Sequence, residues 1–334
     1  MLDERKAAIL RAVVEEYIAT AEPVGSATVA RASELAVSPA TIRNEMAGLE
    51  RDGYLTHPHT SAGRIPTDKG YRFFVDNMAP TGNLQPGQRA AVRDFFNRAH
   101  GALEQMLHDT SQLLSGLTDY AAVVVGPPHE AATIRSVHLV GLAPKVALLV
   151  AVLSNGVVEK RAVELADDVT ETRIAAASSH LAQHLTGSAL GSLVAPPSIG
   201  DVVTDGVVGA AFGGLASGDH SDETDHVFVG GASRMAAAFD TVESVRHVLA
   251  TLEQQFVVVT LLRDVLDRGL SVAIGAETGL EPLAECSVVV APYEVEGELA
   301  GTIGVLGPTR MNYPQALAAV AVVSQRLGRH LTEG

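Results

Sequence analysis

The stretch that decides the fold is SPATIRNEMAGLERDGYLTHPHTSAGRIPTDKGYRFFV, residues 38–75. It begins as a helix, because the Ser38 side chain can accept a backbone N–H and Pro39 suits the first helical position, where no hydrogen bond is lost. Gly53 is the residue type that commonly follows the end of a helix. The sequence therefore predicts a helix over residues 39–51.

The two faces of this predicted helix differ in chemistry. A buried stripe at i, i+4 and i+7 is formed by Ile42, Met46 and Leu49. On or beside the opposite face lie Ala40, Arg43, Asn44, Ala47 and Arg51. Arg and Asn side chains can make bidentate hydrogen bonds to guanine and adenine edges, so this face is a candidate for reading DNA. The alternative is an ordinary solvated face, in which the arginines pair with Glu45 and Glu50.

Two further helices are expected upstream. Residues 3–19 carry apolar residues at helical spacing behind a potential cap, Asp3. GSATVARASE, residues 25–34, starts a short second helix with Ser26 as its cap. Three short helices at this spacing predict a helix–turn–helix unit that reads DNA, although small three-helix units also mediate protein contacts.

A hairpin is expected after the third helix. YLTH, residues 54–57, and YRFFV, residues 71–75, are rich in aromatic and β-branched residues and are predicted as strands. The turn-rich loop between them would complete a winged helix, with Gly63 close to phosphates and Arg64 reaching a phosphate or the minor groove. The loop's two histidines have no Cys and no second His pair beside them, so a metal site is not expected.

The candidate DNA-contacting residues come from the predicted third helix and the predicted wing. They are Ser38, Ala40, Thr41, Arg43, Asn44, Ala47, Arg51, His57, His59, Thr60, Ser61, Gly63, Arg64 and Lys69.

The charge distribution agrees with this assignment. The chain has 334 residues and a formal net charge of -15. Residues 1–75 hold nine basic and ten acidic residues, whereas residues 76–334 hold 15 basic and 29 acidic ones. Because phosphates repel an acidic surface, only the N-terminal part is expected to face DNA.

Cysteine usage and hydropathy indicate a cytoplasmic protein without a membrane partner. The single cysteine, Cys286, excludes an internal disulfide and suits a reducing compartment. The opening MLDERKAAIL is charged and lacks the apolar core of a signal peptide. The longest apolar stretch is interrupted by Pro144 and Lys145, and it falls short of the ~20 residues of a membrane helix.

An α+β body is expected after a linker at residues 76–87. A helical pattern over residues 88–117 suits either packing within its own domain or a seam between subunits. Strands are expected within residues 120–128, 133–142, 145–165, 271–277, 286–295 and 299–307, with helices at about 170–186 and 314–331. This order favours an antiparallel sheet flanked by helices.

A second long helix is expected from Asp240 onward, and it is the best candidate for a helix buried between two subunits. Its apolar stripe consists of Val242, Val245, Leu249, Leu252, Phe256 and Val259. Catalysis is not expected, because no nucleophile–base pair, carboxylate pair or metal motif is found. DHSDETDH, residues 219–226, is interpreted as a solvated acidic loop, and GPTRMNYP, residues 307–314, as a turn before the last helix.

Several of these motifs resemble one family. ATIRNEMAGLERDGYL joined to HPHTSAGRIPTDKGYRFFVDNM, together with IGAETG, CSVVVAPYE and GTIGVLGPTRMNYP, is similar to the heat-inducible transcription repressor family HrcA. The resemblance implies a winged helix–turn–helix at residues 1–75 and a GAF-like α/β domain over residues 88–200 and 269–334. It also implies an inserted dimerisation domain at residues 200–268.

The same resemblance implies a repressor of chaperone operons that binds an inverted repeat in double-stranded DNA. It implies the chaperonin GroEL as a partner, and no cofactor is expected. Since one winged helix reads too few base pairs for specificity, a homodimer on a two-fold symmetric site is expected. The alternative function is a small-molecule-sensing winged-helix regulator that acts through the GAF-like domain.

Overall fold

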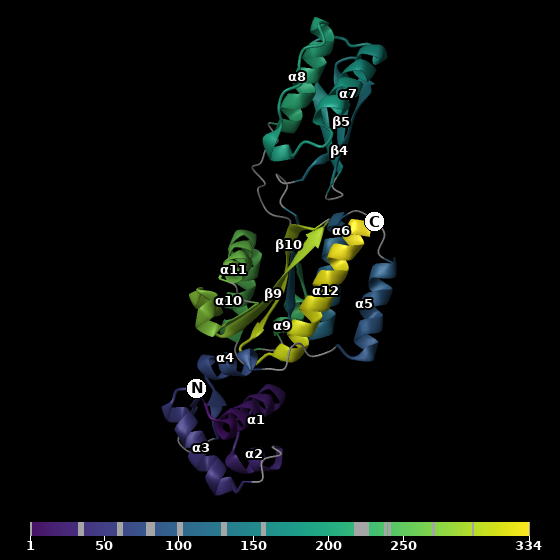
Figure 1. The fold of residues 1–334 in the computed structure, drawn as a ribbon. Helices are drawn as coiled ribbons and strands as arrows, with labels where there is room; N and C mark the ends of the chain where they lie inside the picture. The colour runs from purple at the N-terminus through teal and green to yellow at the C-terminus, as the bar shows by residue number, and fades with distance from the viewer. Residues whose placement is uncertain are drawn as a thin grey trace.

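The computed structural model describes residues 2–32, 37–58, 63–77, 84–98, 103–127, 132–154, 158–216, 227–236, 239, 242–268, 271–295 and 297–333. Figure 1 shows three units in a line, with helices and strands mixed in each of them. We name them the head (residues 2–77), the body (residues 84–127 and 227–333) and the inserted unit (residues 132–216). The body lies between the other two, and the expected α+β multidomain organisation is confirmed.

The head consists of three helices, a short antiparallel strand pair and a fourth helix. Its elements are α1 (Glu4–Thr20), α2 (Ser26–Ala32), α3 (Pro39–Arg51), β1 (Leu55–Thr56), β2 (Ile65–Pro66) and α4 (Asp68–Asp76). Two predicted caps are confirmed, because Asp3 accepts the N–H of Lys6 at 2.8 Å and Ser38 accepts the N–H of Thr41 at 3.2 Å. Ser26 is instead the first residue of its helix.

The predicted apolar stripe of α3 is confirmed, since Ile42, Met46 and Leu49 are fully buried. The strand predicted at YRFFV is wrong, because residues 71–75 lie in α4. Thr67 caps this helix by accepting the N–H of Gly70 at 3.2 Å. Tyr71 and Phe74, three residues apart, are both buried. The segment is therefore helical because of its cap and its helical spacing, although its composition is typical of a strand.

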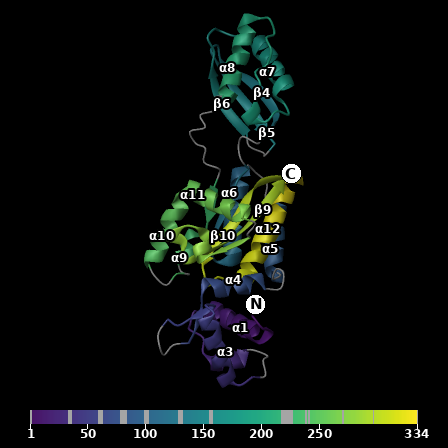
Figure 2. The same ribbon diagram turned by 60° about the vertical axis from the view of Figure 1, so that its left-hand side comes forward.

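A five-stranded antiparallel sheet forms the centre of the body, in the order β7-β3-β10-β9-β8. Its strands are β3 (Ala121–Val125), β7 (Val227–Gly230), β8 (Val272–Ile274), β9 (Cys286–Val295) and β10 (Glu298–Pro308). Neighbouring residues of β9, Val288 and Val289, belong to different hydrophobic clusters, so both faces of the sheet are covered. Figure 2 shows α5 and α12 to one side of the sheet and α10 and α11 to the other.

The final helix of the body lies where the sequence predicts it, whereas the helix expected from Asp240 is divided. The body's helices are α5 (Pro86–Arg98), α6 (Leu103–Thr118), α9 (Ala232–Ala236), α10 (Val242–Glu253), α11 (Gln255–Asp267) and α12 (Tyr313–Glu333), with the 3₁₀ turns η4 (Gly275–Thr278) and η5 (Glu281–Leu283). The pattern over residues 88–117 corresponds to α5 and α6. The helix predicted from Asp240 is interrupted at Gln254, whose φ of -88° and ψ of 80° are not helical. No described helix is both long and apolar enough to cross a membrane.

The inserted unit has its own sheet and core. It contains β4 (Ile134–Ala143), β5 (Val146–Leu153), β6 (Val158–Glu164), α7 (Glu171–Leu185), the turn η2 (Leu190–Ser192) and α8 (Val202–Ala216). The three strands pair antiparallel in chain order. Alternate residues of β5 are buried in one cluster with residues of α7 and α8. The strands and the helix predicted in this region are therefore confirmed.

The position of the insertion differs from the expected residues 200–268. The chain leaves the body after β3 and returns at β7, and these two strands pair with each other. Residues 132–216 therefore form the separate unit, whereas the described part of residues 227–268 belongs to the body. The sequence did not reveal this, because no local pattern shows that β3 pairs with β7 about 100 residues later.

Head and body share one hydrophobic core. A single cluster includes Ile9 of α1, Phe74 of α4 and Val320 of α12. The rings of Tyr71 in α4 and Tyr313 in α12 lie 5.9 Å apart, centroid to centroid. The head is therefore packed onto the body through α4, which lies between α1 and the body in Figure 1.

Candidate nucleic-acid interface

The exposed face of α3 presents an arginine and an amide to solvent. Arg43 and Asn44 are both exposed, and within the described part of the chain neither has a hydrogen-bond or ionic partner. Ala40, one turn earlier, is exposed and small, and Arg51 is exposed at the end of the helix. A ligand can therefore engage this face without breaking an internal contact.

The acidic residues of α3 pair with other elements. Glu45 lies 3.8 Å from Arg5 of α1, and Glu50 accepts a hydrogen bond from Arg64. The alternative in which these two glutamates neutralise the arginines of α3 is therefore not what the structure shows. At the start of the helix, the hydroxyls of Ser38 and Thr41 lie 3.0 Å apart, and further along Ala47 is half-buried.

Arg64 faces α3 rather than solvent. Its Nε donates to Glu50 Oε2 at 3.0 Å, and its side chain is only 14% exposed. Its backbone N–H and carbonyl both pair with Val24, 2.9 Å in each direction. His57 joins the same cluster, with Nε2 3.4 Å from Glu50 Oε2 and Nδ1 3.3 Å from the Gly63 carbonyl. Arg64 therefore fixes the hairpin to α3 and to the segment before α2.

Lys69 is also engaged within the head. Its Nζ donates to the Asp52 carbonyl at 2.8 Å and lies 4.3 Å from the centroid of the Tyr54 ring. A lysine at the C-terminal end of α3 interacts favourably with the carbonyls that have no partner in the helix. Lys69 is therefore held at the end of α3 by a contact within the head.

Gly63 is required by packing inside the head. A Cβ at this position would lie 2.5 Å from the Val24 carbonyl carbon and 2.6 Å from the Pro23 oxygen, both backbone atoms. Gly63 therefore allows the protein's own backbone to come close, and its approach to phosphates stays a prediction. The other predicted wing residues, His59, Thr60 and Ser61, lie outside the described residues.

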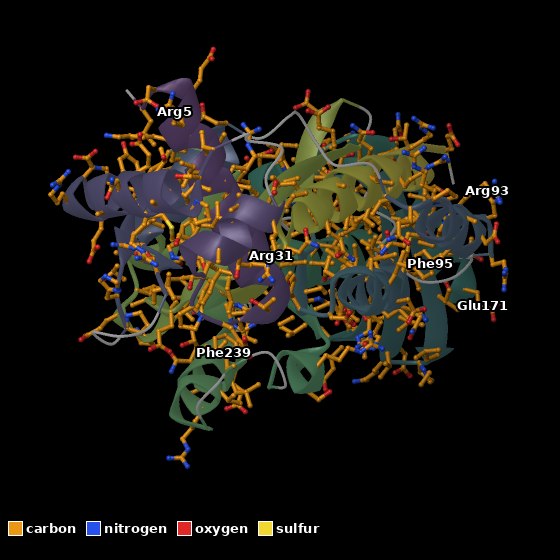
Figure 3. The ribbon with its side chains drawn as sticks, turned by 90° about the horizontal axis from the view of Figure 1, so that it is seen from below. Arg5, Arg31, Arg93, Phe95, Glu171 and Phe239 are labelled. Atoms are coloured by element: carbon orange, nitrogen blue, oxygen red, sulfur yellow. The ribbon has the colours of Figure 1, made fainter. Side chains whose placement is uncertain are left out.

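Figure 3 views the molecule from the head end and shows Arg5 and Arg31 there. Arg31 is exposed on α2 and was not among the candidates from sequence. In the part of the chain that the structure describes, no group of three His, Cys, Asp or Glu side chains is arranged to hold a metal ion.

The residues predicted for dimerisation do not form one exposed stripe. Leu252 and Val259 are buried in the body's second hydrophobic cluster, and Val245 and Leu249 are half-buried. Phe256, beyond the break at Gln254, is 80% exposed. Val242 lies in α10, and its side chain is outside the described part. Part of the stripe is thus buried inside the body, because α11 packs on β9 and β10 and α10 packs on η5, α9 and α11.

One cavity of about 520 Å³ lies beside α11. Its lining includes Phe256, Leu261, Asp264, Arg268, Thr278 and Leu280. The cavity borders the 3₁₀ turns η4 and η5 of the body. It mixes apolar side chains with both charges, and it is a candidate site for a small molecule.

Comparison with known proteins identifies the family. A family model described as the HrcA protein C terminal domain matches residues 104–317. The heat-inducible transcription repressor HrcA of Symbiobacterium thermophilum is 38% identical and covers 98% of this chain and 98% of its own length. The repressor of the same name from Nocardioides sp. is 38% identical and covers 100% of both chains.

One solved structure shares the fold. A crystal structure of a hypothetical protein at 2.2 Å resolution matches with a TM-score of 0.71 and 24% identity, covering 100% of this chain and 99% of that one. The matches in sequence extend from the head, with its exposed α3 face, through the inserted unit to α12. The chain belongs to the HrcA family of heat-inducible transcription repressors.

Proposed function

We propose that this chain represses heat-shock chaperone genes by binding an inverted-repeat operator as a homodimer. The exposed face of α3 is the observation that carries the proposal. In a chain of net charge -15, it offers Arg43, Asn44 and Arg51 to a ligand, and within the described residues none of them has an internal partner. These side chains suit the edges of guanine and adenine and the phosphates between them.

The head would act as a winged helix. In this arrangement α2 and α3 are the helix–turn–helix, α3 enters the major groove, and the loop between β1 and β2 is the wing beside it. The contacts of Arg64 and Lys69 with Glu50 and Asp52 support a positioning role for these two side chains. The body would be the GAF-like domain that carries the head.

The homodimer would form through the inserted unit. Among the described residues, six of the eight exposed large apolar side chains lie in it: Val140, Leu142, Val158, Val194, Ile199 and Val202. Val202 is 86% exposed, and a Cβ at Gly206 or Gly209, on the same side of α8, would meet nothing within 4 Å. A helix of a second copy can therefore approach α8 closely. Apolar surface concentrated in one unit supports an interface between copies.

The chaperonin GroEL is the second proposed partner, and the family resemblance supplies it. The chaperonin would keep the repressor folded and active. During heat stress, unfolded proteins would compete for the chaperonin, and repression would fall. Comparing operator binding by the full chain with and without chaperonin tests this part, and equal binding in both would contradict it.

The test of DNA reading uses the full chain with an inverted repeat from upstream of chaperone genes and a scrambled duplex. Arg43→Ala and Asn44→Ala should each reduce the preference for the operator by about tenfold or more, since a bidentate base contact contributes about 1–3 kcal/mol of discrimination. Arg89→Ala, which removes an exposed arginine of α5 in the body, is the matched control and should leave the preference unchanged. If Arg43→Ala keeps both affinity and preference, α3 does not read the operator.

A second candidate function is small-molecule sensing by the body. The cavity beside α11 favours it, because its volume of about 520 Å³ lies in the range of ligand sites. A thermal-shift screen of the full chain against a metabolite panel tests this function. A ligand that raises the melting temperature of the parent chain but not of Phe256→Ala would support it. No stabilisation by any metabolite would contradict it.

A further inference from the structure

Two side chains of α4, one helical turn apart, connect the head to the body. Asp68 accepts the N–H of Ala276 at 3.3 Å. Arg72 donates from Nε to Glu277 Oε1 at 2.9 Å, and its Nη2 donates to the other carboxylate oxygen of Glu277 and to the Val272 carbonyl at 2.8 Å. The i, i+4 spacing places both side chains on the same face of α4, against β8 and η4.

The body's side of this joint is shaped to receive α4. Gly275 has a φ of 52°, and a Cβ there would collide with the Asp68 carboxylate. Glu277 Oε2 also accepts the N–H of Ile274 at 3.0 Å, so the carboxylate is held by its own turn. Burial would raise the pKa of Glu277, but the hydrogen bonds from Arg72 and Ile274 outweigh it and lower that pKa. The carboxylate is therefore charged at neutral pH.

The contacts of Asp68 and Arg72 with the body determine how α4 is oriented, and the orientation of α4 determines that of α3. Only Thr67 separates β2 from α4, and β2 pairs with β1, which follows α3. Between Asp68 and Arg72 in the sequence, Tyr71 packs near Tyr313 in the shared core. A rotation of α4 on the body would therefore move the hairpin and α3 together. The bidentate Arg72–Glu277 pair opposes this rotation, because it fixes both direction and distance.

We infer that Arg72 and Glu277 are positioning residues that set which half-site spacing the dimer accepts. This inference rests on the proposed function, a DNA-binding homodimer. Two heads held rigidly on two joined bodies present their α3 helices at one separation, and dimeric readers of this kind match half-sites about one helical turn, or a multiple of it, apart. A loosened joint would let each head rotate, so the dimer would accept several spacings.

The test compares operators whose two half-sites are moved apart or together by about two base pairs. The parent chain should lose about tenfold or more in affinity for the altered spacings, whereas Glu277→Ala should lose about threefold or less. Affinity for a single half-site should be equal in both proteins. Asp76→Ala is the matched control, because Asp76 pairs with Arg72 at 3.4 Å within α4, and it should keep the parent's spacing profile.

Two measurements keep the outcome decisive. Arg72→Lys retains the charge but not the bidentate contact, and it should broaden the profile if Glu277→Ala fails to fold. Pulsed electron paramagnetic resonance on Arg31→Cys, spin-labelled in both copies, needs no DNA, and the buried Cys286 stays unlabelled. The head-to-head distance distribution should be narrow in this protein and at least about twofold wider with Glu277→Ala added.

The inference and the proposed function fail differently. Spacing profiles and distance distributions that coincide between the parent and the two joint variants would overturn the inference alone. If the parent chain binds no operator at any spacing while its distance distribution is narrow, the proposed function is overturned.

Discussion

Glu50 of α3 accepts a hydrogen bond from Arg64 of the hairpin, with the two atoms 3.0 Å apart. The same carboxylate oxygen lies 3.4 Å from Nε2 of His57, on the other arm of the hairpin. One carboxylate at the end of α3 therefore contacts both arms of the loop. The position of that loop relative to α3 depends on a group that itself need not touch DNA.

Arg64→Ala should weaken operator binding by loosening the hairpin rather than by removing a phosphate contact. We expect the free energy of unfolding to fall by about 1–2 kcal/mol, since the guanidinium is mostly buried against a charged partner. The slope of log affinity against log salt concentration should stay unchanged, whereas loss of a phosphate contact would reduce it by about 1. Binding titrations at several salt concentrations and denaturant unfolding measure the two quantities. A reduced slope with unchanged stability would return Arg64 to the role that the sequence predicts.

Gly63→Ala should destabilise the head, and Gly25→Ala should not. A Cβ at Gly63 would meet the backbone of Pro23 and Val24, whereas a Cβ at Gly25 would meet nothing within 4 Å. Backbone atoms cannot move aside as a flexible side chain can, so we expect a loss of about 1–3 kcal/mol for the first variant. Thermal unfolding followed by circular dichroism measures the difference. Equal melting temperatures for the two variants would show that the hairpin is free to move away from Pro23.

Val202→Glu and Phe256→Glu distinguish two locations for the dimer contact. Both side chains are largely exposed, the first on α8 of the inserted unit and the second on α11 of the body. A charge buried at an apolar interface is strongly unfavourable, so we expect Val202→Glu to raise the dimer dissociation constant by about tenfold or more. Phe256→Glu should leave it unchanged. Sedimentation equilibrium measures both constants, and the reverse result would place the contact on α11, where the sequence predicts it.

Cys286 should be unreactive in the folded chain. Burial, with a smaller contribution from Glu285, raises the pKa of its thiol to about 12, so the nucleophilic thiolate is scarce near neutral pH. A thiol reagent at pH 8 should label the native chain at least about 100-fold more slowly than the unfolded chain. Since Cys286 begins β9 in the central sheet, labelling reports unfolding of the body. Rapid labelling of the native chain would show that the body opens locally at this strand.

Capping residues and apolar spacing in the sequence predicted the helices of the head correctly as far as α3. The cap at Ser38 and the buried spacing of Ile42 and Met46 act within one helix, and they hold in the structure. The segment YRFFV failed because aromatic composition suits a strand or a helix, and the cap at Thr67 decides between them. The boundaries of the inserted unit failed for another reason, since strand pairing between β3 and β7 joins residues about 100 positions apart.

Candidate site residues were predicted by type more reliably than by role. Arg43 and Asn44 lie where the helical period places them, on the exposed face. Arg64 and Lys69 were predicted from charge alone, and charge does not reveal a partner that folding brings close. The contacts of Glu50 and Asp52 with these cations depend on the path of the hairpin, which no short motif encodes.

The core common to α1, α4 and α12 has a consequence for how the molecule melts. Because Phe74 and Val320 belong to one cluster, we expect α3 to unfold together with the body rather than in a transition of its own. The stability of the body would then set the temperature at which the head loses its fold. A fragment that ends at residue 75 would lack the last residue of α4 and would expose the aromatic side chains of this helix to water. A fragment of the head that folds by itself is therefore expected to extend beyond residue 75.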